Sequence, residues 1–167
     1  MRWTDPAPEA HDAELRIARG WLDPAEAARL MDALLVEVPW EVHRIRMFGR
    51  EVDSPRLSCW MGDAGAAYRY SGTRFMPHGW PPSLQSLRER LQDELQRPFN
   101  SVLANRYRDG RDAMGWHSDD EPELGDRPLI ASLSLGATRR FLLRHRREPA
   151  RRLALALEPG SLLLMGG

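Results

Sequence analysis

Residues 99–107 read FNSVLANRY, and residues 129–135 read LIASLSL. The first stretch alternates with the period of two that is typical of a β-strand, and the second is a short, largely apolar run that suits a central strand. Further strands are predicted over residues 139–146, 151–157 and 162–165, with a turn at residues 158–161. The second half of the chain therefore reads as a run of short strands joined by tight turns.

The first half of the chain contains two predicted helices. Asp23-Pro24-Ala25-Glu26 combines a capping residue, a proline at the first helical position and a glutamate three residues after the cap, so a helix is predicted from Pro24 to Glu37. A second helix is predicted to begin at Ser83 and to end before Pro98, because leucines recur at helical spacing. Shorter strands are predicted over residues 15–18, 42–47 and 56–60, with a hairpin tip at residues 47–50 between the last two.

This order of elements predicts the fold class. Two early helices followed by many strands indicate a mainly β protein with flanking helices (α+β), in which the helices pack on one side of a double-sheet sandwich. A jelly-roll, also called a double-stranded β-helix, is the expected form. We expect one domain over residues 1–167, with a loose lead-in over residues 1–12.

Composition excludes several classes of protein. The chain has 167 residues, of which 42% are hydrophobic and 29% charged, as expected for a globular domain. It has no apolar run long enough to cross a bilayer, so no membrane partner is expected. A single cysteine excludes an intramolecular disulfide and predicts a cytoplasmic location. Because the net charge is zero, contact with nucleic acid would need a local basic patch, and every basic residue is an arginine.

His117 and Asp119 are two residues apart within the stretch WHSDDE at residues 116–121. On an extended strand this spacing places both side chains on one face, where an imidazole and a carboxylate can hold one divalent metal. A third ligand would complete the two-histidine, one-carboxylate set typical of non-haem Fe(II) oxygenases. Most such pairs are surface polar residues, so the surrounding residues must decide between the two interpretations.

Other residues have both a functional and a structural interpretation. Asn105 and Tyr107 alternate on one face of the 99–107 strand, where a polar ligand or an internal hydrogen-bond pair would satisfy them. Tyr68 and Tyr70 share a strand face, as core residues or as binding aromatics. Phe48 at the predicted hairpin tip either folds back on the core or acts as a wedge between stacked bases.

Three ordered motifs resemble the AlkB-like Fe(II)- and 2-oxoglutarate-dependent dioxygenases, which reverse alkylation damage in nucleic acids. They are residues 105–110 (NRYRDG), residues 116–121 (WHSDDE) and residues 130–139 (IASLSLGATR), the last followed by Phe141. The resemblance covers the chain from about Val42 onward. It implies oxidative dealkylation of bases in DNA or RNA with Fe(II), 2-oxoglutarate and O₂, releasing the alkyl group as an aldehyde together with succinate and CO₂.

The resemblance also implies roles for individual residues. His117 and Asp119 would be iron ligands and catalytic residues, and Asn105 and Tyr107 would contact 2-oxoglutarate. Residues 41–70 would form a substrate-recognition hairpin region, and residues 99–167 the jelly-roll core. The residues that the resemblance assigns to substrate binding are Tyr68, Tyr70, Glu121, Arg56 and Phe48.

The family carries its second iron histidine, and the arginines that bind 2-oxoglutarate, after the strand that here reaches Gly167. Intact motifs before this point favour a sequence lacking its C-terminal segment over a degraded relative. In a chain ending at Gly167, His145 would be the least implausible substitute ligand, and activity would be impaired. A non-catalytic nucleic-acid-binding module, and an oxygenase acting on protein or a small molecule, stay open as alternatives. We expect a monomer.

Overall fold

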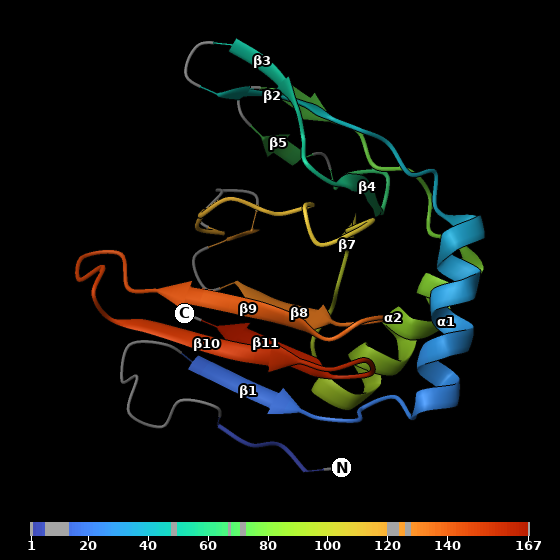
Figure 1. The fold of residues 1–167 in the computed structure, drawn as a ribbon. Coiled ribbons are helices and arrows are strands. Elements are labelled where there is room, and N and C mark those ends of the chain that lie inside the picture. The colour runs from blue at the N-terminus through green and yellow to red at the C-terminus, as the bar shows by residue number, and fades with distance from the viewer. Residues whose placement is uncertain are drawn as a thin grey trace. The chain divides into compact units, whose positions relative to one another are not determined.

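The computed structural model describes residues 2–5, 14–47, 50–66, 68–70, 73–119, 124–125 and 128–166. The chain divides into two compact units (Figure 1). The first contains Met1–Asp32 and Leu124–Gly167, and the second contains Ala33–Glu123. The candidate metal pair, His117 and Asp119, and the candidate cosubstrate residues, Asn105 and Tyr107, belong to the second unit, whereas the substitute ligand His145 belongs to the first.

The first unit contains two antiparallel sheets. One has the strand order β1-β11-β8, and the other pairs β9 with β10. Their strands are β1 (Glu14–Ala18), β8 (Leu129–Leu133), β9 (Arg139–Arg144), β10 (Arg152–Leu157) and β11 (Leu162–Gly166). Ile17 of β1 and Leu163 of β11 share one apolar core with Leu155 and Leu157 of β10. The alternation predicted for residues 151–157 thus turns every second side chain of β10 towards that core.

Two local features complete this unit. Thr4, in the expected lead-in, pairs with Ile17 of β1 through backbone hydrogen bonds of 3.0 and 2.8 Å, so this residue extends the sheet edge. Gly160 lies in the turn before β11 with a φ of +77°, and its carbonyl accepts a hydrogen bond from the N–H of Leu22 at 3.1 Å. The turn therefore requires both a left-handed backbone and a close approach, which a glycine allows.

Both predicted helices are present. α1 spans Pro24–Glu37, and its first turn has the expected reciprocal cap: the N–H of Glu26 donates to the Asp23 carboxylate at 2.8 Å, and the N–H of Asp23 donates to the Glu26 carboxylate at 3.1 Å. α2 spans Pro82–Leu95 and buries Leu84 and Leu91. Among the described residues, no helix is long and apolar enough to cross a membrane.

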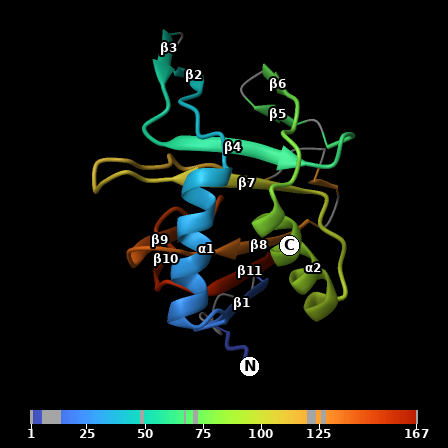
Figure 2. The same ribbon diagram turned by 90° about the vertical axis from the view of Figure 1, so that its right-hand side faces the viewer.

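The described residues of the second unit form three two-stranded sheets, and two of these pairings differ from the sequence prediction. Residues 42–47 were predicted to pair with residues 56–60. Instead, β2 (Arg44–Met47) pairs with β3 (Arg50–Asp53), and β4 (Leu57–Gly62) pairs with β7 (Ser101–Arg106), the two lying side by side in Figure 2. Pro55 separates β3 from β4 and has no N–H for a sheet ladder, which ends the hairpin there.

The second unit also contains a short hairpin and an apolar core. β5 (Tyr68–Tyr70) forms a short hairpin with β6 (Thr73–Phe75). Val38, the β4 residues Cys59 and Met61, and Leu84 of α2 form the buried core, and the partly buried Val102 and Ala104 of β7 pack against it. The described residues of the whole chain are thus mainly strands with two helices, and this confirms the α+β class.

Candidate metal and cosubstrate site

The predicted metal pair lies in a loop. β7 ends at Arg106, and no strand is assigned to the described residues from 107 to 119. The expectation that His117 and Asp119 share a strand face is therefore wrong, as is the extension of the 99–107 strand to Phe99 and Tyr107. The turn at residues 109–111 takes the chain out of the β4–β7 ladder, which begins at Ser101 and ends at Arg106.

The two side chains nevertheless converge. His117 Nε2 lies 3.5 Å from Asp119 Oδ1, and the two side chains are 36% and 42% exposed. His117 Nδ1 lies 2.9 Å from the carbonyl oxygen of Gly115. Because a carbonyl can only accept, Nδ1 donates in this contact, and Nε2 is the ring nitrogen that faces Asp119. A metal-binding histidine is commonly held in this way, with its second ring nitrogen donating to a carbonyl.

This pair of donors fits a divalent transition metal. Imidazole nitrogen and carboxylate oxygen together suit non-haem Fe(II). A separation of 3.5 Å is short enough for one ion bonded to each atom at about 2.1 Å. Within the described ranges, no group of three histidine, cysteine, aspartate or glutamate residues forms a possible metal site. His145 belongs to the other unit, where its Nδ1 accepts a hydrogen bond from the N–H of Glu148 at 2.9 Å.

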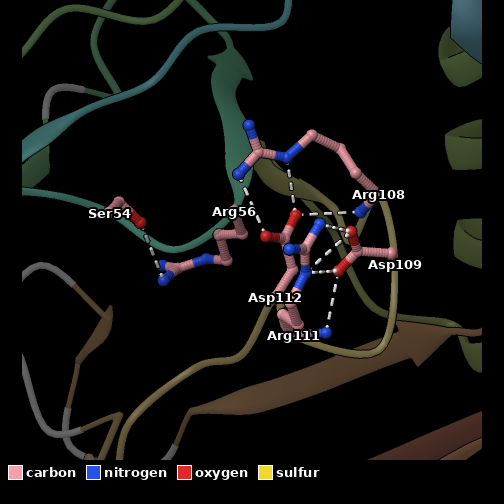
Figure 3. A network of polar contacts seen from close by, with 6 residues as sticks. All are labelled: Ser54, Arg56, Arg108, Asp109, Arg111 and Asp112. Atoms are coloured by element: carbon pink, nitrogen blue, oxygen red, sulfur yellow. Dashed lines mark hydrogen bonds and ion pairs between the residues drawn. The ribbon is translucent and has the colours of Figure 1, made fainter.

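The loop that carries the metal pair is held by a buried carboxylate. Asp112 is 7% exposed and accepts hydrogen bonds from Arg108 Nε at 2.8 Å, from Arg108 Nη2 at 3.0 Å and from the Arg108 N–H at 2.9 Å (Figure 3). These bonds from the guanidinium, and next that from the backbone, lower the pKa of Asp112 to about 2. The ionised carboxylate thereby closes the turn after β7.

Two further contacts fix the start of this loop. Arg111 binds the Asp109 carboxylate through Nη2 at 2.7 Å and through its backbone N–H at 2.8 Å, side by side with the Arg108–Asp112 pair in Figure 3. The N–H of Ala113 donates to the carbonyl of Pro55 at 3.0 Å. The loop is thus anchored next to the start of β4 before it reaches His117.

Asn105 lies on β7 opposite Ser58 of β4. Its side-chain Oδ1 accepts a hydrogen bond of 2.6 Å from Nε of Arg56, and Nη1 of the same arginine donates to Ser54 Oγ at 3.2 Å. Arg56 is only 7% exposed, although the family resemblance assigns it to substrate binding. The structure therefore brings a predicted substrate residue together with a predicted cosubstrate residue.

The remaining predicted residues are placed only in part. Tyr107 is half-buried just after β7. Tyr68 and Tyr70 are on β5 as predicted, but their side chains lie outside the described part of the structure. Phe48 and Glu121 lie outside the described residues altogether. The sequence did not single out Arg108 or Asp112, because two opposite charges four residues apart are a known pair only on a helix.

Comparison of the chain with known proteins identifies its family. The family model of the 2OG-Fe(II) oxygenase superfamily matches residues 14–167. The chain belongs to this superfamily. Its members carry the Fe(II) and 2-oxoglutarate of their name, so the superfamily agrees with the donor types found at His117 and Asp119.

Individual relatives narrow the comparison. Mouse alpha-ketoglutarate-dependent dioxygenase alkB homolog 3 is 40% identical over 159 residues, covering 89% of this chain and 54% of its own. The human protein of the same name is 37% identical over 156 residues, with the same coverage of 89% and 54%. Human DNA oxidative demethylase ALKBH2 is 40% identical over 151 residues, covering 84% and 58%. The resemblance to AlkB-like members of the superfamily is confirmed, and the chain spans about half the length of the curated relatives it matches.

Proposed function

We propose that the protein carrying this chain is an Fe(II)- and 2-oxoglutarate-dependent dioxygenase that removes alkyl groups from bases in DNA or RNA. The convergence of His117 Nε2 and Asp119 Oδ1 at 3.5 Å, in a chain of the 2OG-Fe(II) oxygenase superfamily, carries this proposal. The names of the relatives, which include a DNA oxidative demethylase, support the dealkylation of nucleic acid.

The chemistry would be divided between the cofactors and the protein. Fe(II), when bound, supplies the activation of O₂ coupled to the conversion of 2-oxoglutarate to succinate and CO₂. His117 and Asp119 would hold the iron, with a third ligand from outside the described residues. The Gly115 carbonyl would keep the His117 ring in the metal-binding tautomer. Asn105 and Tyr107 would each donate a hydrogen bond to 2-oxoglutarate.

The substrate would be an alkylated base turned out of its stack. Extrusion costs less for a damaged base than for a normal one, which supplies part of the selectivity. Tyr68 and Tyr70 would stack on the flipped base, and Glu121 would face its edge. Phe48 would fill the space that the base leaves in a duplex.

The first unit offers a surface that suits a phosphate backbone. On β9, Arg140 and Arg144 are exposed on either side of the exposed Leu142, and Arg152 of β10 lies opposite Arg144. Arginine forks bind phosphate oxygens well. Because the chain as a whole has no net charge, a local concentration of arginines is what nucleic-acid binding requires. Affinity through such contacts falls with added salt.

We extend the proposal to fold and location. The shared core of the two sheets in the first unit supports a jelly-roll. Cys59 is buried, and burial raises the pKa of its thiol to about 11, which suits a thiol that stays reduced in the cytoplasm.

A monomer is proposed, which sedimentation of the purified protein would test.

The decisive experiment uses the full-length gene product with Fe(II), 2-oxoglutarate and an oligonucleotide carrying one methylated base. We expect succinate and formaldehyde to appear together with the repaired base. Nucleic-acid binding without succinate would support a non-catalytic module instead. Turnover with protein extract or small molecules, but not with the oligonucleotide, would support an oxygenase with a different substrate.

A further inference from the structure

Arg56 holds its guanidinium between two neutral acceptors in the second unit. Nε donates to Asn105 Oδ1 at 2.6 Å, and Nη1 donates to Ser54 Oγ at 3.2 Å. The residue is 7% exposed, and Figure 3 shows its guanidinium directed at Ser54. A buried arginine is expensive unless its donors are used, so these contacts define the place of the side chain.

The contact determines which way the Asn105 amide faces. A guanidinium has only donors, so the atom that it meets must be the amide oxygen. The amide nitrogen of Asn105 then faces away from Arg56. With its oxygen engaged, Asn105 offers a new ligand two N–H donors and a strongly reduced acceptor capacity.

The donor character of the Asn105 amide matches 2-oxoglutarate. The two carboxylates and the ketone of 2-oxoglutarate are acceptors only, and they require donors. A nucleobase edge presents donors and acceptors in a mixture. An asparagine locked as a donor is therefore better suited to the cosubstrate than to reading a base.

We propose that Arg56 is a positioning residue for the cosubstrate: it orients the Asn105 amide for donation to 2-oxoglutarate and does not itself contact the nucleic acid. This role rests on the proposed function, because it requires Asn105 to bind 2-oxoglutarate. It reassigns Arg56 from the substrate-binding set, to which the family resemblance assigns it.

The neighbouring backbone supports the same assignment. Pro55, next to Arg56, accepts the hydrogen bond from Ala113 that anchors the metal-pair loop. Residues 54–56 thus contact β7 through the Asn105 side chain and the 113–119 loop through its backbone. A segment bound on both sides places the cosubstrate donor and the metal pair in a defined relation within this unit.

The test measures 2-oxoglutarate binding by calorimetry in the full-length, Mn(II)-loaded protein, which does not turn over. Arg56→Met keeps an apolar side chain that reaches about as far as the arginine Nε and removes all its donors. We expect it to weaken 2-oxoglutarate binding about tenfold, and Arg56→Lys to restore part of the loss, because one hydrogen bond is regained. The affinity for a methylated oligonucleotide should stay unchanged in both variants.

A second pair of variants isolates the route through Asn105. If Arg56 acts only by orienting that amide, Arg56→Met should cause no further loss in an Asn105→Ala background, whereas independent roles would add. Asn105→Asp keeps an acceptor for Arg56 and removes the donor. It should bind 2-oxoglutarate at least tenfold more weakly while melting near the wild-type temperature, and it remains informative if Arg56→Met does not fold.

Exposed Arg97→Met, beyond α2 in the same unit, serves as the matched control and should change neither affinity. A loss of oligonucleotide affinity with unchanged 2-oxoglutarate binding in Arg56→Met would overturn the positioning role and return Arg56 to the substrate. Wild-type binding of 2-oxoglutarate by Asn105→Asp would overturn it as well. If the wild-type protein itself does not bind 2-oxoglutarate, the proposed function fails, and this role fails with it.

Discussion

The carboxylate of Asp112 accepts three hydrogen bonds from one residue, Arg108, at 2.8, 2.9 and 3.0 Å. Two come from the guanidinium and one from the backbone, so the pair closes a ring around the turn that follows β7. All three acceptor contacts favour the ionised carboxylate. The order of the loop that leads to His117 is therefore coupled to the charge of Asp112.

A pH dependence of stability follows from this pair. The pKa of Asp112 falls from an ordinary value of 3.8 to about 2 on folding, so its stabilisation is complete above pH 3.8 and is lost as the pH falls through about 2. Urea unfolding between pH 5 and pH 2 should show a smaller acid-induced loss in Asp112→Asn than in the wild type. Asp93→Asn, on the exposed side of α2, provides the control. Equal slopes in all three proteins would contradict the coupling.

His117→Ala should abolish turnover without weakening oligonucleotide binding. Removal of a residue that merely orients a metal ligand typically costs about 10–100-fold in activity or metal affinity, and loss of the ligand itself should cost more. Metal content and succinate formation measure the effect. The exposed His78→Ala is the matched control, because His78 lies away from Asp119 beside Glu41. Similar losses in both variants would argue against a metal role for His117.

Tyr70→Ala should weaken the binding of a methylated oligonucleotide. Stacking of one base on an aromatic side chain contributes about 1–3 kcal/mol, so the dissociation constant should rise by roughly one to two orders of magnitude. Fluorescence anisotropy with labelled oligonucleotides would measure it. The same oligonucleotide without the methyl group provides the reference, and an equal loss on both would show that Tyr70 does not stack on the damaged base.

Phe48→Ala should separate duplex from single-stranded substrates. Only a duplex has to be pried open and kept open, so a wedge contributes nothing to a strand that is already unpaired. Repair of a methylated duplex should slow markedly, and repair of the matching single strand should keep its wild-type rate. Parallel loss on the two substrates would reject the wedge.

Gly160→Ala should destabilise the fold more than Gly20→Ala. Both glycines have a positive φ, +77° and +63°, which costs an alanine about 1–2 kcal/mol. Only Gly160 also faces a backbone neighbour, the carbonyl of Leu22, whereas a Cβ on Gly20 meets nothing within 4 Å. Urea midpoints of the two variants should therefore differ, and equal midpoints would show that the turn can shift away from Leu22.

Elements built by local interactions were predictable from the sequence. The cap of α1 depends on Asp23 and Glu26, three residues apart, and both hydrogen bonds form as expected. The alternation over residues 151–157 predicted β10 to within one residue. The helix cap and the strand could be predicted because the interacting groups are neighbours along the chain. The proposed metal pair was chosen from the two-residue spacing of His117 and Asp119, but the two residues lie in a loop and not on the strand that this spacing suggested.

Pairings between distant segments were decided only by the tertiary structure. β4 was expected in a hairpin with residues 42–47 but pairs with β7, where Ser58 lies opposite Asn105. The pairing of β4 with β7 brings Arg56 into contact with Asn105, 49 positions away. No local spacing in the sequence predicts this contact. The amino-acid sequence by itself thus determined which groups are available for metal and cosubstrate chemistry. The orientation of these groups depends on the long-range pairing of strands and on side-chain contacts in the loop after β7. Strand pairing depends in turn on which distant surfaces can be buried together, so the local sequence does not determine it.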